Sequence, residues 1–231
     1  MNKVTKDIVG MHARLIIKLL IKLNLAALAS FKKSIQRDNK INNVYILMYH
    51  RVNDYRKNEM SVPVREFRKQ VAWLKKRGIQ SMRMAELEST APVVDLKTPR
   101  VIFTFDDGYE DNYSEALPIL KEFGYTAIFY IPYECIGKVD MFPRDIRESN
   151  CLEHNRIMDW EQVIRIHREG MEIGSHTLSH NDLKKMSDQK AKREIFESKK
   201  MIEEKLGSKI SSFCYKIDFF HRKRPFLTIS S

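Results

Sequence analysis

One stretch, Val101 to Gly108, constrains the fold of this chain more than any other. It reads Val-Ile-Phe-Thr-Phe-Asp-Asp-Gly, so an apolar, β-prone run ends abruptly in two carboxylates and a glycine. The run is typical of a buried strand, and the glycine predicts a sharp turn at its carboxyl end. Two adjacent carboxylates are costly to bury unless a positive group shares them, and a metal ion is the usual partner.

A second polar segment, Ser175 to His180, reads Ser-His-Thr-Leu-Ser-His and follows a strand-like run over Met171 to Gly174. Each motif alone has a bland interpretation, because Asp favours turns and helix caps and a histidine pair four apart can be solvated. Together they would place two carboxylates and two imidazoles at the C-terminal ends of separate strands. One carboxylate and two neutral imidazoles make a three-ligand metal set, and the second carboxylate is free to act as a base.

The rest of the chain alternates between strand-like and helix-like segments. This alternation predicts an α/β fold with a parallel sheet, either open or rolled into a barrel. Asp111 is expected to cap a helix in which Pro118 predicts a kink or a late start, and Asp159 with Gln162 predicts a capping box. We expect strands at 44–48, 79–82, 101–105, 126–131, 171–174 and 210–215, and helices at 63–77, 84–88, 112–123, 160–169 and through 191–206.

Charge is distributed unevenly along the 231 residues, whose formal net charge is +11. Residues 1–40 contain nine Lys/Arg and two acidic residues, and residues 216–231 contain four Lys/Arg and one Asp. The part between them is close to neutral, which argues against a nucleic-acid-binding face. The three cysteines, Cys135, Cys151 and Cys214, suggest separate thiols, not a disulfide framework.

Residues 14–31 are apolar but interrupted by Lys18, Lys22 and Asn24, which is too polar for a bilayer span. An interfacial amphipathic helix fits best, with a domain-covering helix and a signal peptide as alternatives. Residues 14–37 are therefore expected to contact an anionic membrane surface. Peripheral membrane association or the cell envelope is the favoured location, and the cytoplasm stays open.

The two polar motifs resemble those of a known family. Thr104-Phe-Asp-Asp-Gly108 and His176-Thr-Leu-Ser-His180 are similar to the first two signature motifs of the polysaccharide deacetylases, the NodB-type carbohydrate esterases. The resemblance runs from about Val44 to about Tyr215. It also includes Met48-Tyr-His-Arg-Val52, Asp111-Asn-Tyr113 and Gly170-Met-Glu-Ile-Gly-Ser175.

The resemblance implies a distorted, incomplete β/α barrel that removes acetyl groups from an N-acetylhexosamine polysaccharide or glycan. It implies that Asp107 binds a divalent metal, zinc by preference, together with His176 and His180. Asp106 is the general base by the same resemblance. His50, directly after the first strand, is expected to line the same cleft and contact substrate, with a packed loop histidine as the alternative.

The chain departs from the family pattern after Phe213-Cys-Tyr215. Family members continue with a Pro-x-Gly turn, an Arg that orients the base and a His that protonates the leaving amine, whereas this chain reads Lys216-Ile-Asp-Phe-Phe-His to Ser231. We therefore expect a basic N-terminal segment and linker (1–43), a partial deacetylase domain lacking its last strands (44–215) and a divergent basic tail (216–231). Low turnover is expected, and an impaired metal-binding remnant or a membrane-surface interaction protein is the alternative function.

Overall fold

The computed structural model describes residues 21–22, 44–55, 60–88, 99–142 and 155–216. The expected linker at 32–43 and nearly all of the tail lie outside these residues. No helix in the described part of the chain has the length and apolar character needed to cross a bilayer.

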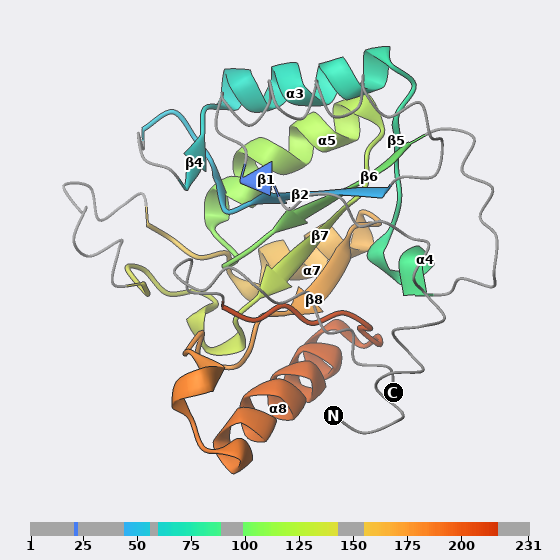
Figure 1. The fold of residues 1–231 in the computed structure, drawn as a ribbon. Coiled ribbons are helices and arrows are strands. Elements are labelled where there is room, and N and C mark those ends of the chain that lie inside the picture. The colour runs from blue at the N-terminus through green and yellow to red at the C-terminus, as the bar shows by residue number, and fades with distance from the viewer. Residues whose placement is uncertain (1–20, 23–43, 56–59, 89–98, 143–154, 217–231) are drawn as a thin grey trace.

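The fold is built on a single parallel sheet with the strand order β1-β2-β6-β7-β8 (Figure 1). A sixth strand, β5, pairs with the first residues of β6, ahead of the stretch that pairs with β7. A separate parallel pair joins β3 to β4. The strands are β1 (Ile21–Lys22), β2 (Val44–Tyr49), β3 (Arg51–Val52), β4 (Ser61–Val62), β5 (Gln80–Ser81), β6 (Arg100–Phe105), β7 (Ala127–Ile131) and β8 (Glu172–Ser175).

Both faces of the sheet are buried because its central strands are apolar along their whole length, as parallel strands covered on two sides usually are. Alternate residues face opposite ways. One set packs with the helices into the large core, and the other forms a smaller cluster on the opposite face. The large core takes Tyr45, Leu47 and Tyr49 of β2 and Val101, Phe103 and Phe105 of β6, while the small cluster takes Val44, Ile46, Ile102, Ile128, Tyr130 and Cys214.

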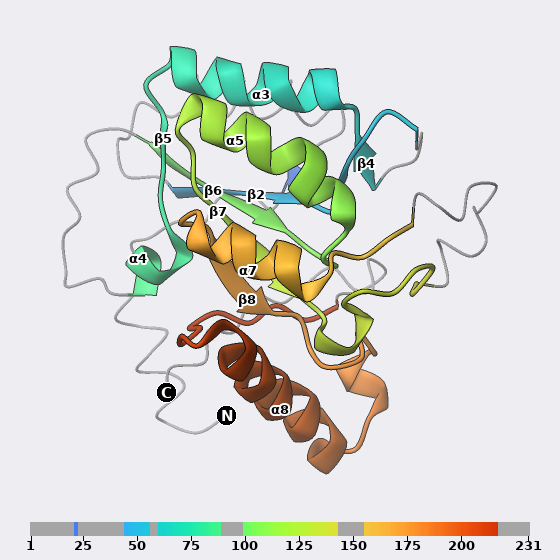
Figure 2. The same cartoon turned by 180° about the vertical axis from the view of Figure 1, so that it is seen from behind.

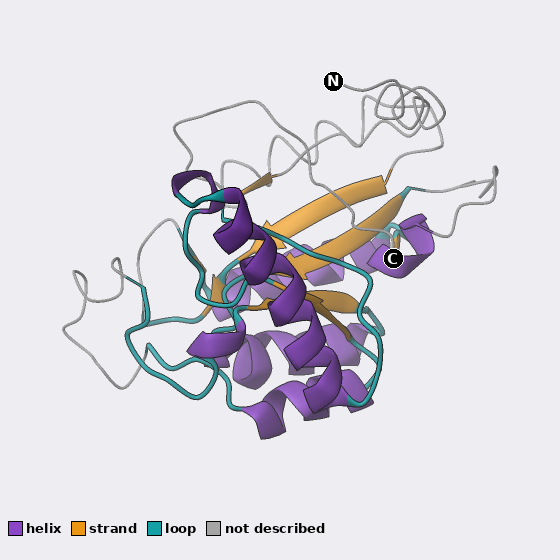
Figure 3. Cartoon of the chain, turned by 90° about the horizontal axis from the view of Figure 1, so that it is seen from below, coloured by secondary structure: helices purple, strands orange, loops and turns teal. Residues whose placement is uncertain are grey.

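The helices follow the strands in the expected order. Helices α3 and α5 lie together along one side of the sheet, and α8 lies at its far end beside β8 (Figures 1 and 2). Seen from below, the strands form an open layer with the helices packed along it (Figure 3). The α-helices are α3 (Val64–Lys76), α4 (Met84–Glu88), α5 (Leu117–Phe123), α7 (Trp160–Arg168) and α8 (Asp188–Leu206), with short 3₁₀ turns η2 (Tyr133–Cys135) and η4 (Leu183–Lys185).

Pro118 has the effect that its position predicts. The segment before it is a π-helical turn, η1 (Asn112–Ala116), and the α-helix proper begins only at Leu117. Proline lacks the N–H for the usual bond and crowds the preceding turn, so the regular α-helix starts late. The predicted capping box is also present, with Asp159 Oδ1 accepting from Gln162 N at 2.8 Å.

Three expectations were wrong. Asp111 makes no side-chain cap to η1, because its carboxylate instead binds buried Arg51 at 2.8 Å. Residues 210–215 form no regular strand and join the sheet by a single bridge, Ser175 to Phe213. Residues 21–22 lie in strand β1, not in a helix, because the free edge of β2 pairs with them. The remaining residues of 14–31 lie outside the described part.

Candidate active site

The candidate site lies where β2, β6 and β8 end. His50, Asp106 and His176 each directly follow one of these strands, so the parallel ladder brings their backbones to one edge. The ladder continues one residue past the strands, because Asp106 N donates to Tyr49 O at 3.0 Å. The C-terminal edge of a parallel sheet is where α/β proteins place their functional groups.

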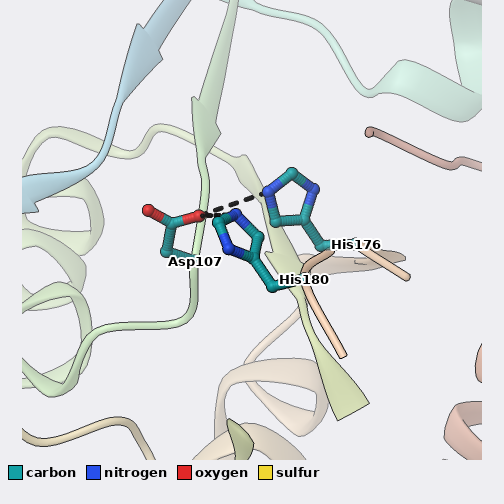
Figure 4. A group of neighbouring side chains, drawn as sticks. All are labelled: Asp107, His176 and His180. Carbon is teal, nitrogen blue, oxygen red and sulfur yellow. Dashed lines mark ion pairs between the residues drawn. The ribbon is translucent and has the colours of Figure 1, made fainter. Parts of the chain in front are cut away.

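Three side chains meet at this edge. Asp107 Oδ1 lies 3.2 Å from His176 Nε2 and 3.0 Å from His180 Nε2, and both imidazoles point toward the carboxylate (Figure 4). Asp107 and His176 are buried, and His180 is only slightly exposed. The three groups could hold one metal ion, since their ligand atoms all lie within 4.8 Å of one another.

The backbone reaches this arrangement through unusual conformations. Asp107, Thr177 and His180 have φ values of 74°, 72° and 59°, in the left-handed region that side chains other than glycine rarely adopt. For Thr177 the conformation is costly because its side chain is β-branched. Non-glycine residues in this region mark sites where surrounding contacts hold a strained conformation for function.

Neighbouring groups contact both imidazoles, and one of them orients His176. His176 Nδ1 lies 2.9 Å from the carbonyl oxygen of Cys214, and because a carbonyl only accepts, Nδ1 carries the proton. Nε2 of a neutral His176 is then the nitrogen with a free lone pair facing Asp107. Such a second hydrogen bond is the usual device for orienting a metal-binding histidine. The Phe142 ring packs edge-on against His180, with centroids 4.5 Å apart.

The two carboxylates of the dyad differ in their electrostatics. Burial alone would raise the pKa of Asp107, but His176 and His180 hold it well below its usual range. In turn, against the lowering effect of burial, Asp107 raises the pKa of His176 well above its ordinary value. Burial raises the pKa of Asp106, against the lowering effect of nearby His176.

The donor set fits a divalent metal of the zinc type. Asp106 Oδ1 is buried with no hydrogen-bond partner among the described residues, and Asp107 Oδ1 faces only the two imidazole nitrogens, so the pocket has oxygens that a cation could complement. Donors at about 2.0–2.1 Å from a tetrahedral zinc ion lie roughly 3.3 Å apart, close to the separations between Asp107 and the two imidazoles. One oxygen and two nitrogen donors also match the ligands that zinc takes in catalytic sites.

The structure thus brings together the four predicted residues of the dyad and the histidine pair, with His50 at the same sheet edge. It adds two residues that the sequence did not single out. Cys214 lies with its Sγ 3.9 Å from Asp106 Oδ2. The two residues are far apart in the chain, so no local sequence pattern could predict this contact. Glu194 of α8 accepts hydrogen bonds from the loop before His180. In the sequence it is one of several charged residues of a long helix, and only its position next to apolar Ile195 indicates that it could face the protein interior.

Comparison with known proteins decides the family. The profile of the polysaccharide deacetylases matches residues 94–220, which is more than half of the chain and includes both motifs. This chain belongs to the polysaccharide deacetylase family. The deacetylase fold is also found in a Streptococcus pyogenes deacetylase, PplD, solved with acetate, at a TM-score of 0.60 and 22% identity over 73% of this chain and 71% of that one. The sheet described above is therefore the incomplete β/α barrel of these deacetylases.

Two curated relatives of this deacetylase domain are similar over much of its length. YxkH of Bacillus subtilis, named as a polysaccharide deacetylase, is 28% identical over 181 residues. That alignment covers 77% of this chain and 58% of YxkH. The poly-β-1,6-N-acetyl-D-glucosamine N-deacetylase of Escherichia coli K12 is 29% identical over 59% of this chain and 21% of its own length. The chain thus spans little more than half of the first relative and about a fifth of the second.

Proposed function

We propose that this chain hydrolyses the acetamide of N-acetylhexosamine units in a polysaccharide or glycan, releasing acetate and leaving a free amine. The observation that carries the proposal is the convergence of Asp107, His176 and His180 beside Asp106, whose Oδ1 has no hydrogen-bond partner among the described residues. Membership of the deacetylase family supports the reaction class. The name of the Escherichia coli relative supports N-acetylglucosamine polymers as the substrates to test first.

Asp107, His176 and His180 would hold a divalent cation, with zinc as the first candidate. When bound, such an ion polarises the acetamide carbonyl and lowers the pKa of its water. The low pKa of Asp107 keeps it ionised as an anionic ligand. The hydrogen bond from His176 Nδ1 to Cys214 O leaves the lone pair of Nε2 as the second ligand for the metal.

Asp106 is the proposed general base. Its Oδ1 is buried and lacks a hydrogen-bond partner among the described residues, so it can accept a proton from the attacking water. Burial raises the pKa of Asp106, which makes its carboxylate a stronger base than an exposed one. The water oxygen bonds to the acetyl carbon while its proton goes to Asp106.

His50 is the proposed proton donor to the leaving amine. It follows Tyr49, whose carbonyl accepts from Asp106 N at 3.0 Å, so its backbone lies beside the dyad. The described residues contain two histidines besides the ligand pair, and the other one, His167, lies in the last turn of α7 and hydrogen-bonds Ser208. As the C–N bond breaks, His50 would protonate the nitrogen. The expectation of low turnover stays a prediction, and it would be wrong if His50 supplies this proton.

Acetate release from N-acetylglucosamine oligomers, measured on the full chain with and without added zinc, tests the proposal. We expect release that needs the metal and is lost in Asp106→Asn at unchanged metal content. Asp188→Asn, which changes an exposed aspartate at the start of α8, should behave as wild type. Release that survives both chelation and Asp106→Asn would contradict the proposal.

A further inference from the structure

Helix α8 presents two polar side chains on the face that meets the sheet edge. Glu194 and Ser198 lie four residues apart and so share one side of the helix. Ser198 is fully buried, and Glu194 is half-buried. Polar groups in such places need partners, and both find them next to the candidate metal ligands.

Glu194 binds the loop that joins the two histidines. Its Oε2 accepts from Leu178 N at 2.9 Å and from Ser179 N at 3.0 Å, and its Oε1 accepts from Ser179 Oγ at 2.6 Å. Hydrogen bonds to an ionised acceptor are about twice as strong as neutral ones. One carboxylate therefore holds two consecutive amides directly before His180.

The loop needs such a partner because its backbone is strained and cannot bond to itself in a regular way. Thr177 and His180, on either side of the two bound amides, both have left-handed φ values. The carbonyls of Thr177 and Leu178 accept from Tyr133 N and Glu134 N of η2, at 3.2 and 2.8 Å. The loop is thus held through its carbonyls by η2 and through its amides by Glu194.

Ser198 makes a matching contact one helical turn further along. Its Oγ lies 2.6 Å from Ser175 Oγ, and Ser175 directly precedes His176. The same face of α8 is therefore attached to the residue before the first histidine and to the loop before the second. This double attachment couples the separation of the two imidazoles to the position of one rigid helix.

We propose that Glu194 is a positioning residue for the metal centre, setting the place of His180 relative to Asp107 and His176. The inference rests on the proposed metal site and goes beyond it. Glu194 touches neither metal nor substrate and acts through the backbone of Leu178 and Ser179. Loss of its carboxylate releases the strained loop and weakens metal binding.

The test is a Co²⁺ titration of the metal-free full chain, followed by the visible absorption of the bound ion. Loss of a residue that supports the metal ligands without touching the metal typically weakens metal binding roughly 10–100-fold. We expect a rise in Kd of that order for Glu194→Ala. Glu194→Gln should retain most of the affinity, because one amide oxygen can still accept from both backbone N–H groups. Glu197→Gln, which breaks only an exposed pair with Arg193 on the same helix, is the matched control and should bind as wild type.

Hydrogen exchange supplies a second readout that needs no metal. The Leu178 and Ser179 amides should exchange faster in Glu194→Ala than in wild type, whereas in Glu197→Gln they should not. Unchanged Co²⁺ affinity in a folded Glu194→Ala variant would overturn the positioning role and leave the metal site intact. If Glu194→Ala does not fold, Glu194→Gln with the affinity and absorption of a wild-type site supports the role, and a Gln variant that has lost the site overturns it. A wild-type chain that binds no Co²⁺ would overturn the metal site and the positioning role together.

Discussion

The buried ion pair between Arg51 and Asp111 should be the most stability-critical polar contact beside the site. Both side chains are almost fully buried, and Arg51 Nε lies 2.8 Å from Asp111 Oδ2. The same carboxylate accepts from Val52 N at 3.1 Å and Asn53 Nδ2 at 3.0 Å. Arg51 also donates to Asn155 Oδ1 at 2.9 Å, so the pair joins the segment after His50 to the segment before α7.

Replacing Asp111 by Asn keeps the shape but removes the charge that balances Arg51. Leaving one partner of a buried ion pair uncompensated costs about 3–5 kcal/mol. For a chain of this size each kcal/mol shifts Tm by roughly 2–4 °C, so Asp111→Asn should lower Tm by about 10 °C. The surface pair Arg68–Glu122 is a matched control, because its atoms lie 2.6 Å apart but both side chains are about half exposed. Glu122→Gln should cost less than about 1 kcal/mol.

Urea unfolding followed by circular dichroism measures both variants under the same conditions. Because only the Arg51–Asp111 pair is buried, we expect a large loss for Asp111→Asn and almost none for Glu122→Gln. Equal losses in the two variants would refute it, because contact distance alone would then set the strength of the pair.

Three further predictions follow from the site. His50→Gln should lower the rate of acetate release by roughly 10²–10⁴-fold, with Co²⁺ affinity unchanged, and a wild-type rate would exclude His50 as the proton donor. Because Asp107 raises the pKa of His176, this imidazole should lose a proton when it becomes a ligand, so Co²⁺ affinity should rise with pH. Calorimetry in two buffers of different ionisation enthalpy should detect proton release at pH 7, and none would be inconsistent with a protonated His176. Gly174→Ala should cost roughly 1–3 kcal/mol in urea unfolding, because its Cβ would lie 2.5 Å from buried Tyr130 and 3.1 Å from Ser212 O, and an unchanged stability would show that β8 can shift.

The sequence predicts the central strands well because their signal is local. The segments that become β2, β6 and β7 are apolar on both faces, and a strand buried on two sides needs that pattern. Both motifs were also placed correctly, since a glycine turn and a loop after short apolar runs put polar residues at strand ends.

Contacts between distant segments are what the sequence could not supply. Asp111 is a residue type that often caps helices and it precedes a helical segment, but its carboxylate binds the buried guanidinium of Arg51 instead. The run 210–215 has the residues of a strand, yet the described structure pairs it with β8 through one bridge only. Cys214 looks like an isolated thiol until the fold places it between His176 and Asp106.

The central claim is that Asp107, His176 and His180 form one metal centre that drives deacetylation with Asp106. It is tested most directly by adding Zn²⁺ stepwise to the metal-free full chain while acetate release from N-acetylglucosamine oligomers is recorded. The account predicts a rate that rises with bound zinc and levels off at about one equivalent, and that stays at baseline in His176→Ala. A rate independent of zinc, or a His176→Ala variant that binds and responds as wild type does, would contradict it.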